Sequence, residues 1–303
     1  SPRAQATPRT ESIEPTPKNA GEVREAITRY VSQTGKQLPE FNDTTLQVAM
    51  GSAARIMDHC SENGVIIDFM DSEDERQWVR RYAAVPNPPL MLFSLGDTSI
   101  MDMPTIAIIG TRNPTALGRS MAESAARKSV EAGFCVVSGL AMGCDVEAHR
   151  STLENKGKTA AVLAHGLGEV HPIQHTEIAH QIIERGGCLL SEYSPGTPIE
   201  RGYFVERDRL QSAGSLGVLV IETSITGGSM HTVGFAEKQN RPVACLNHPK
   251  KYHNKETVKG NRQLIDKGAM SIWDESSFDN FLNSLKSHSS LTDRREPKQE
   301  SLI

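Results

Sequence analysis

Short apolar runs alternate with longer amphipathic stretches between residues 105 and 246, and this alternation predicts the fold. The short runs are apolar at nearly every position, which is typical of strands that are covered on both faces. Strands that alternate with helices predict an α/β fold with a doubly wound parallel sheet and right-handed crossovers. The strands are expected at residues 105–109, 134–138, 158–164, 187–191, 216–221 and 242–246, and the helices at 116–131, 145–155, 174–185, 206–213 and 229–239.

The flanking segments differ from this core in composition, and they suggest five parts. Residues 1–20 are proline-rich and polar and are expected to form a disordered tail. Residues 21–64 form a small helical N-terminal region, and 65–104 form a lead-in segment that packs on the core. The core domain covers 105–273. Residues 274–303 form a C-terminal helix and a polar tail.

Finer elements are expected inside the flanking parts, from apolar periodicity and from the positions of glycine and proline. The expected helices are 21–37, 45–63, 74–82, 261–267 and 276–285, and the expected short strands are 65–70, 90–93 and 270–273.

A glycine-bearing turn follows the first core strand and contains Gly110, Thr111, Arg112 and Asn113. Backbone N–H groups and helix N-termini point to the carboxyl edge of such a sheet, so phosphates bind there. Glycine lets the backbone approach a phosphate, and the arginine fork suits its oxygens. Thr111, Asn113 and Thr115 add hydrogen-bond donors to the turn, or one of them caps the next helix. A structural turn with a surface arginine would look similar, but we favour a phosphate-bearing ligand.

A second turn follows the next strand and contains Gly139 and Gly143. Asp145 is interpreted as the N-cap of the following helix, and His149 lies one helical turn later on the same face. A ligand contact and a hydrogen-bonded structural role are both open for His149. The GxGxxG fingerprint of dinucleotide-binding folds is absent.

Two further stretches are candidates for anion binding. Arg207 and Arg209 are expected at the start of a helix, where both could face one anion near the helix N-terminus. Glu206 and Asp208 could instead neutralise them in a surface network. A later glycine turn enters a helix after a strand and offers a second cradle of N–H groups, formed by Gly228, Ser229 and Thr232.

Charge is mildly acidic, with a net charge of −4 and a pI of about 6.2. This balance argues against a protein that coats duplex DNA by charge alone, so a nucleic-acid contact would need a local basic patch. Residues 246–268 offer one, although a solvated loop is an equal alternative. Its basic residues are Lys250, Lys251, Lys255, Lys259, Arg262 and Lys267.

The remaining composition favours a cytoplasmic protein without a metal or a cofactor. The five cysteines are scattered and form no CxxC pair, which indicates a reducing compartment and no zinc site. His165, His171 and His175 cluster, but their spacing fits no regular metal motif. No apolar run approaches the roughly 20 residues that span a bilayer, and no signal core is evident. The sequence has no nucleophile elbow, Walker A turn or paired carboxylate motif, which favours a binding protein over an enzyme.

An ordered series of motifs runs from about residue 65 to residue 273. It includes Pro88-Pro-Leu90, Gly110-Thr-Arg112, Ser138-Gly-Leu-Ala141, Gly157-Lys-Thr159, Ser191-Glu-Tyr193, Gly228-Ser229 and Gly260-Asn261. In this order the series resembles the bacterial DNA-processing protein A family, known as DprA or Smf. The resemblance implies an extended Rossmann-like fold that binds single-stranded DNA, protects it and helps to load the RecA recombinase during natural transformation and recombination. It also implies a homodimer.

The resemblance assigns roles to individual residues. Arg112 would lie in the basic DNA pocket, and Arg207 and Arg209 match the family's Arg-Asn-Arg motif. The chain departs from the family pattern at three positions. Aspartate replaces a usual asparagine, methionine replaces a common arginine or lysine, and glycine replaces a usual serine; these are Asp208, Met142 and Gly228.

A second class of function uses the same fold. The fold resembles that of nucleotide-sensing domains and of the LOG-type nucleotide phosphoribohydrolases, so a nucleotide-binding sensor or hydrolase is the alternative. The acidic net charge and Asp208 favour it. Against it, the hydrolases' Pro-Gly-Gly-x-Gly-Thr turn and catalytic glutamate are missing.

Overall fold

The computed structural model of the chain describes residues 42–292. The chain divides into two compact units, residues 1–59 and 60–303. Helix α2 (Asp43–Asn63) matches the helix predicted at 45–63. The predicted tail at 1–20, the predicted helix at 21–37 and the end of the polar C-terminal tail lie outside the described residues.

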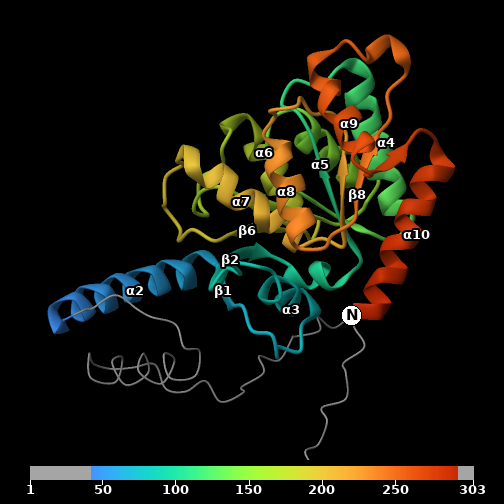
Figure 1. The fold of residues 1–303 in the computed structure, drawn as a ribbon. Helices are drawn as coiled ribbons and strands as arrows, with labels where there is room; N and C mark the ends of the chain where they lie inside the picture. The colour runs from blue at the N-terminus through green and yellow to red at the C-terminus, as the bar shows by residue number, and fades with distance from the viewer. Residues whose placement is uncertain (1–41, 293–303) are drawn as a thin grey trace, which may run out of the picture. The chain divides into compact units, whose positions relative to one another are not determined.

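The second unit is built on one nine-stranded sheet in the order β1-β2-β6-β5-β4-β3-β7-β8-β9 (Figure 1). Strands β3 to β9 are mutually parallel, as predicted for the core, whereas β2 runs antiparallel to both β1 and β6. The strands are β1 (Ile66–Phe69), β2 (Met91–Gly96), β3 (Thr105–Ile109), β4 (Cys135–Ser138), β5 (Thr159–Leu163), β6 (Cys188–Ser191), β7 (Gly217–Val220), β8 (Val243–Leu246) and β9 (Met270–Ile272).

Helices cover both faces of this sheet. The α-helices are α3 (Gln77–Ala83), α4 (Ala116–Glu131), α5 (Cys144–Glu154), α6 (Thr176–Glu184), α7 (Arg201–Ala213), α8 (Ser229–Lys238), α9 (Glu256–Asp266) and α10 (Glu275–Thr292). Short 3₁₀ turns are η1 (Thr98–Asp102), η2 (Ile173–His175) and η3 (Lys250–Tyr252). No helix within residues 42–292 is long and apolar enough to cross a membrane.

The central strand β3 shows why its sequence is apolar from Ile106 to Ile109. Ile106 and Ile108 are fully buried in a cluster with residues of α4, α5 and α10. Ala107 and Ile109 face the opposite side and pack with residues of α8 and α9. Side chains of a strand alternate between faces, so a strand with helices on both faces is apolar along most of its length. The polar residue of β3, Thr105, is buried and donates its hydroxyl to the carbonyl of Gly214 (2.9 Å). The prediction of a doubly wound α/β fold is confirmed.

The chain reverses its direction of winding at β3. It proceeds from β3 through β4 and β5 to β6 on one side, and then crosses to β7 on the other side of β3. The loops after β3 and β7 therefore diverge toward opposite faces. In open α/β sheets this divergence leaves a crevice at the carboxyl ends of the strands, where ligands bind. The fold thus brings together the turns that the sequence singled out at Gly110 and at Gly228.

Two helix starts were predicted five residues too late. Helix α7 begins at Arg201, five residues before the predicted 206, although Gly202 in its first turn has a low helix propensity. Helix α9 begins at Glu256 rather than at 261 and includes Gly260. A Cβ on Gly260 would lie 2.6 Å from the carbonyl oxygen of Thr223, so packing requires the glycine there. In α9 a tertiary contact thus overrides the low helix propensity of glycine. Helix α3 begins at Gln77 rather than at 74, and α10 continues to Thr292 beyond the predicted end at 285.

Candidate nucleic-acid interface

The turn after β3 is tied to its neighbours by backbone hydrogen bonds. The N–H of Thr111 donates to the carbonyl of Glu222 after β7 (2.7 Å), and the N–H of Cys144 donates to the carbonyl of Thr111 (3.2 Å). Gly143 has φ of +80°, and a Cβ there would lie 2.4 Å from the Thr111 oxygen. The backbone of Gly143 therefore packs directly against the backbone of this turn, at a distance too short for any side chain.

A cavity of about 400 Å³ opens at the switch point between β3 and β7. It brings together seven of the residues predicted to bind phosphate from three separate stretches of sequence. They are Gly110, Thr111, Arg112, Arg207, Gly228, Ser229 and Thr232. Asn113 is exposed beside the cavity, and its N–H donates to the hydroxyl of Thr111 (3.2 Å).

Arg112 is the exposed arginine of this cavity. Its guanidinium lies over the ring of Phe204 in the first turn of α7, 4.9 Å from the ring centroid. Such a cation–π contact orients the guanidinium without occupying its N–H donors. Arg112 is therefore positioned by packing and retains its hydrogen-bonding capacity toward solvent or a ligand.

Arg207 lines the same cavity but is only 4% exposed. Its Nη1 donates to the carbonyl of Val162 at the end of β5 (2.9 Å). Gly139 makes this position possible, because a Cβ there would lie 1.7 Å from Arg207 Nη1. Gly139 also donates its N–H to the Asp145 carboxylate (3.1 Å). Asp145 is buried near Arg207 and lies inside α5, so its prediction as an N-cap is wrong; Gly143 holds that position.

Asp208 lies beneath the cavity beside Arg207. Its Oδ1 is 3.4 Å from Arg207 Nε and accepts a hydrogen bond from Gln211 (3.0 Å). Burial raises the pKa of Asp208 from 3.8 to about 7; Arg207 opposes this shift and Asp145 adds to it. The ionised form of Asp208 thus offsets the charge of Arg207 in the interior. The alternative interpretation of this stretch had placed that neutralisation in a surface network.

Arg209 does not line either cavity of this site. It is the ninth residue of α7, and its Nη2 bonds both carboxylate oxygens of Glu192, which follows β6. The interpretation that Arg207 and Arg209 face one anion at a helix start is wrong, because α7 begins at Arg201 and the two side chains take different partners. Glu206 likewise turns away and accepts a hydrogen bond from the hydroxyl of Tyr193 (2.7 Å).

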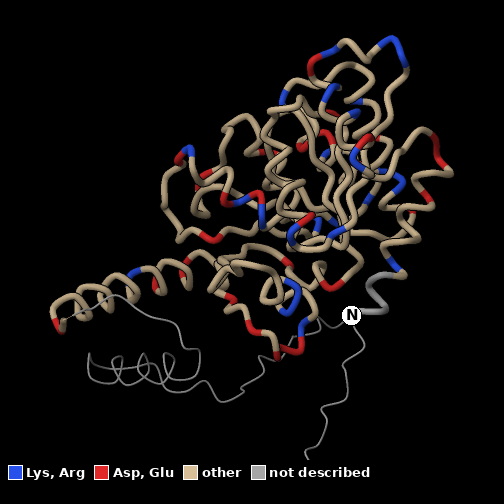
Figure 2. The backbone as a smooth tube through the Cα atoms, in the orientation of Figure 1, with Lys and Arg blue, Asp and Glu red and all other residues tan. Residues whose placement is uncertain are grey.

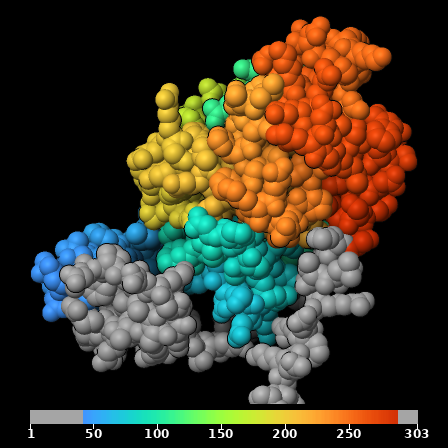
Figure 3. Space-filling model, in the orientation of Figure 1, coloured from blue at the N-terminus to red at the C-terminus, as the bar shows by residue number. Residues whose placement is uncertain are grey.

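The turn after β7 forms the opposite wall of the cavity. Helix α8 begins at Ser229 without a side-chain cap, and Gly228 precedes it in helical conformation. A Cβ on Gly228 would meet no atom within 4 Å, so this part of the wall is open. In Figure 3 the yellow surface of α7 adjoins the orange surface of α8, and both helices contribute to the cavity.

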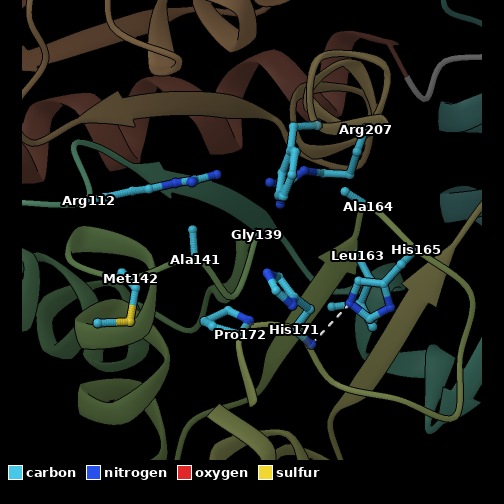
Figure 4. Close-up of a pocket in the computed structure, with 11 residues that line it drawn as sticks. Arg112, Gly139, Ala141, Met142, Leu163, Ala164, His165, His171, Pro172 and Arg207 are labelled. Carbon is cyan, nitrogen blue, oxygen red and sulfur yellow. Dashed lines mark hydrogen bonds between the residues drawn. The ribbon is translucent and has the colours of Figure 1, made fainter. Parts of the chain in front are cut away.

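A smaller cavity of about 70 Å³ continues past Arg112 and Arg207 toward the end of β5 (Figure 4). Arg112 and Arg207 extend into it from opposite sides, and Met142 and Pro172 form part of its apolar wall. His165 Nε2 accepts a hydrogen bond from the backbone N–H of His171 (3.3 Å). Together the two cavities form one groove along the carboxyl edge, since they share Arg112, Ala141, Phe204 and Arg207.

Three of the candidate histidines have a hydrogen-bonding partner for Nδ1 within the protein, namely His149, His165 and His175. His149 is fully buried with Nδ1 2.7 Å from the Thr159 hydroxyl, and burial lowers its pKa to about 3. It is therefore a structural residue rather than a ligand contact. His175 Nδ1 lies 2.7 Å from the carbonyl of Leu140. Within residues 42–292, no group of three or more His, Cys, Asp or Glu side chains is arranged to hold a metal ion.

The predicted basic patch does not line the groove. Lys250 and Lys251 lie in η3, Lys255 precedes α9, and Lys259 and Arg262 border a separate shallow depression. Lys259 pairs with Glu256 (2.7 Å). Figure 2 shows acidic and basic residues interspersed along the elements of this region. The patch follows β8, so it lies beyond the carboxyl end of a strand two places from β3.

A buried hydrogen-bond network, which the sequence analysis missed, joins the two walls of the crevice. Glu222, the second residue after β7, accepts hydrogen bonds from the backbone N–H (2.8 Å) and the hydroxyl (2.6 Å) of Thr115. Thr115 caps α4, which is one of the two roles predicted for the three candidates. His248 Nε2 lies 3.1 Å from Glu222, and both side chains are fully buried. Burial raises the pKa of Glu222, but the hydrogen bonds from His248 and Thr115 outweigh it, so the net shift is downward. The sequence contained one signal for this network: Glu222 directly follows the strand predicted at 216–221.

Fold and site together define an α/β protein with a groove lined by glycine turns and arginines at the switch point of its sheet. Residues 70–285 match the family model described as DNA recombination-mediator protein A. The chain is 36% identical over 207 residues to Protein Smf of Synechocystis sp., covering 67% of this chain and 51% of that protein. It is 30% identical over 220 residues to the DNA processing protein DprA of Bacillus subtilis, covering 72% of each chain. The chain belongs to the DNA recombination-mediator protein A family, the DprA/Smf family.

Solved structures agree with this assignment. DNA processing protein A from Helicobacter pylori, solved to describe its single-stranded DNA binding mode, is 28% identical with a TM-score of 0.61, covering 73% of this chain and 96% of that one. DprA from Streptococcus pneumoniae, 24% identical with a TM-score of 0.66, covers 83% of this chain and 89% of that one and shows the same fold. The matched region spans about half the length of the Synechocystis relative.

Proposed function

We propose that this chain binds single-stranded DNA along the groove at the carboxyl edge of its sheet and acts as a recombination mediator by binding rather than by catalysis. The observation that carries the proposal is the position of Arg112. Its exposed guanidinium lies over Phe204, between the glycine turns after β3 and β7. The Helicobacter relative, which covers most of this chain, was studied for binding of the same ligand.

The groove is suited to contact the phosphate backbone of DNA rather than to read its base sequence. Arg112 faces the cavity with its guanidinium, which recognises phosphate oxygens without reading bases. The uncapped start of α8 lines the cavity at Gly228 and Ser229, and the next two N–H groups, of Met230 and His231, donate to the carbonyls of Gly227 and Gly228. Phe204 offers an aromatic ring beside the arginine, and aromatic rings stack on any base. Binding of this kind is independent of sequence and weakens with salt.

The test is fluorescence anisotropy of a labelled oligo-dT at several salt concentrations, with duplex DNA as competitor. Arg112→Ala is expected to weaken binding by about tenfold or more, since a charged hydrogen bond contributes roughly 1.5–3 kcal/mol. Arg119→Ala removes the same charge from an exposed position in α4 and is the matched control, which is expected to bind like the parent.

Equal binding by the parent and Arg112→Ala would place the DNA elsewhere on the surface. Absence of binding at low salt, together with a thermal shift on adding mononucleotides, would support the nucleotide-binding alternative instead.

We also propose that the bound strand is passed to a RecA-type recombinase and that the protein acts as a homodimer, as the family resemblance implies. Filament assembly by RecA on DNA coated with single-strand-binding protein is expected to become faster when the protein is added. The Arg112→Ala variant is expected to lose this acceleration. Light scattering of the protein alone measures the oligomeric state independently.

A further inference from the structure

A carboxyl group lies beneath the proposed DNA groove, where an anionic ligand would be repelled by its charge. Asp208 lines the switch-point cavity together with Arg112 and Arg207, and it is only 8% exposed. Its Oδ1 lies 3.4 Å from Arg207 Nε, and the same oxygen accepts a hydrogen bond from Gln211 (3.0 Å). This placement is stable for a protonated or an ionised carboxyl, because Gln211 donates to either form.

The charged and titratable groups around Asp208 come from four elements. Arg207 and Gln211 belong to its own helix α7, Asp145 comes from α5, and Arg112 comes from the turn after β3. His231 of α8 borders the same cavity and is exposed. Burial also raises the pKa of Asp145. When Asp208 is ionised, its negative charge cancels much of the positive charge of Arg207 beneath the groove. When Asp208 is protonated, that cancellation is partly removed.

We propose that Asp208 makes DNA binding by this chain dependent on protonation: the protonated carboxyl permits a phosphate above Arg207, and the ionised carboxyl opposes it. The proposal rests on the DNA-binding function proposed above. Binding of a phosphate beside a carboxyl favours its protonated form, so binding and proton uptake are linked. The raised pKa of Asp208, about 7 because of burial, puts this change within the physiological range.

The expected effect is a loss of affinity as pH rises. If binding requires the protonated carboxyl, the affinity for single-stranded DNA falls by about tenfold between pH 6 and pH 8. Asp208→Asn keeps the shape and the acceptor for Gln211 but carries no charge. This variant is expected to bind at pH 8 as tightly as the parent binds at pH 6, with a flat pH profile.

The experiment is anisotropy at constant ionic strength from pH 5.5 to pH 8.5, with an oligo-dT that carries a 5′-hydroxyl so that no terminal phosphate titrates. Calorimetry in buffers of different ionisation enthalpy at pH 7.5 measures proton uptake directly. Uptake is expected for the parent and is expected to be absent for Asp208→Asn. Asp279→Asn, an exposed position on α10, makes the same charge change elsewhere and should leave the profile of the parent unaltered.

Histidines are the rival source of such a profile, since they also lose positive charge between pH 5 and pH 8. His231, His165 and His171 border the groove. A profile that persists in Asp208→Asn and disappears in His231→Gln would overturn the proposal. An affinity of the parent protein that does not change with pH would also overturn the proposal.

The folding of the variant is checked in the same series. Because the folded-state pKa of Asp208 is raised, its contribution to stability is present at low pH and is lost as pH rises through about 7. The Tm of Asp208→Asn is therefore expected to exceed that of the parent at pH 8 and to approach it at pH 5. Absence of DNA binding by both parent and Asp208→Asn at every pH would instead refute the DNA-binding function, so the two failures are distinguishable.

Discussion

Gly139 and Gly228 both border the groove, but only one of them is required by packing. A Cβ on Gly139 would lie 1.7 Å from Arg207 Nη1 and 2.8 Å from the Asp145 carboxylate. Both neighbours are buried and hydrogen-bonded, so neither can move cheaply. A Cβ on Gly228 would meet nothing within 4 Å, and its backbone is already helical. The same residue type therefore serves a steric purpose in one wall of the groove and leaves open space in the other.

Gly139→Ala is expected to lower the free energy of unfolding by about 1–3 kcal/mol, because overpacking displaces the Arg207 side chain. Gly228→Ala is expected to change it by less than about 0.5 kcal/mol. Urea denaturation of both variants measures the difference. The assignment of Gly139 as a spacer for Arg207 would fail if the two variants were equally stable. Binding by Gly228→Ala then reports separately whether a ligand approaches the α8 turn closely.

At the scale of elements, the groove depends on the alignment of two loops that leave the sheet in opposite directions. Glu222 links the end of β7 to Thr115, the residue that caps α4, and His248 after β8 completes the link. Three successive parallel strands thus share one buried hydrogen-bond network. Because every partner is held by backbone or by a cap, this network fixes the spacing between the turn of Arg112 and the turn of Gly228.

Glu222→Gln keeps the size of the side chain but removes the charge, and we expect a loss of about 2–3 kcal/mol in the free energy of unfolding at pH 7. The pKa of Glu222 is lowered from 4.5 in the folded protein, so its stabilising contribution is present above 4.5 and is lost as pH falls through the folded-state pKa. The gap between parent and variant should therefore narrow in acid. Urea unfolding at pH 7 and pH 4 tests this, with Glu131→Gln, exposed on α4, as the control. A gap that is constant with pH would contradict an ionised Glu222.

At the scale of the whole molecule, the sequence predicted the order of the core elements, because the pattern that defines them is local. Strand β3 and helix α4 have the predicted bounds, 105–109 and 116–131. The location of Arg207 and Arg209 could not be predicted in this way. Their destinations depend on β5 and on the loop after β6, which are distant in sequence and adjacent only in the folded sheet. Periodicity identifies which elements form, whereas partners of buried charges are set by topology.

The acidic net charge of −4 makes the distribution of positive charge decisive for binding. In the groove Arg112 is exposed, whereas Arg207 is buried against Asp208. A short oligonucleotide that fills only the groove should therefore show a shallow salt dependence. The basic segment from Lys250 to Lys255 lies past the end of β8, outside the groove but beyond the same edge of the sheet. A longer strand that leaves the groove over β7 and β8 would pass near it.

We therefore expect the slope of log Kd against log salt to be steeper for a dT20 oligonucleotide than for dT6. Each phosphate contact on a single strand contributes roughly 0.7 to the slope. Replacing Lys250, Lys251 and Lys255 by alanine should remove the excess for dT20, by about 1–2 units, and leave dT6 unaffected. Arg112→Ala should instead reduce the slope for both lengths. Equal slopes for dT6 and dT20 in the parent would show that the basic segment is a solvated surface, and that the groove holds the DNA without it.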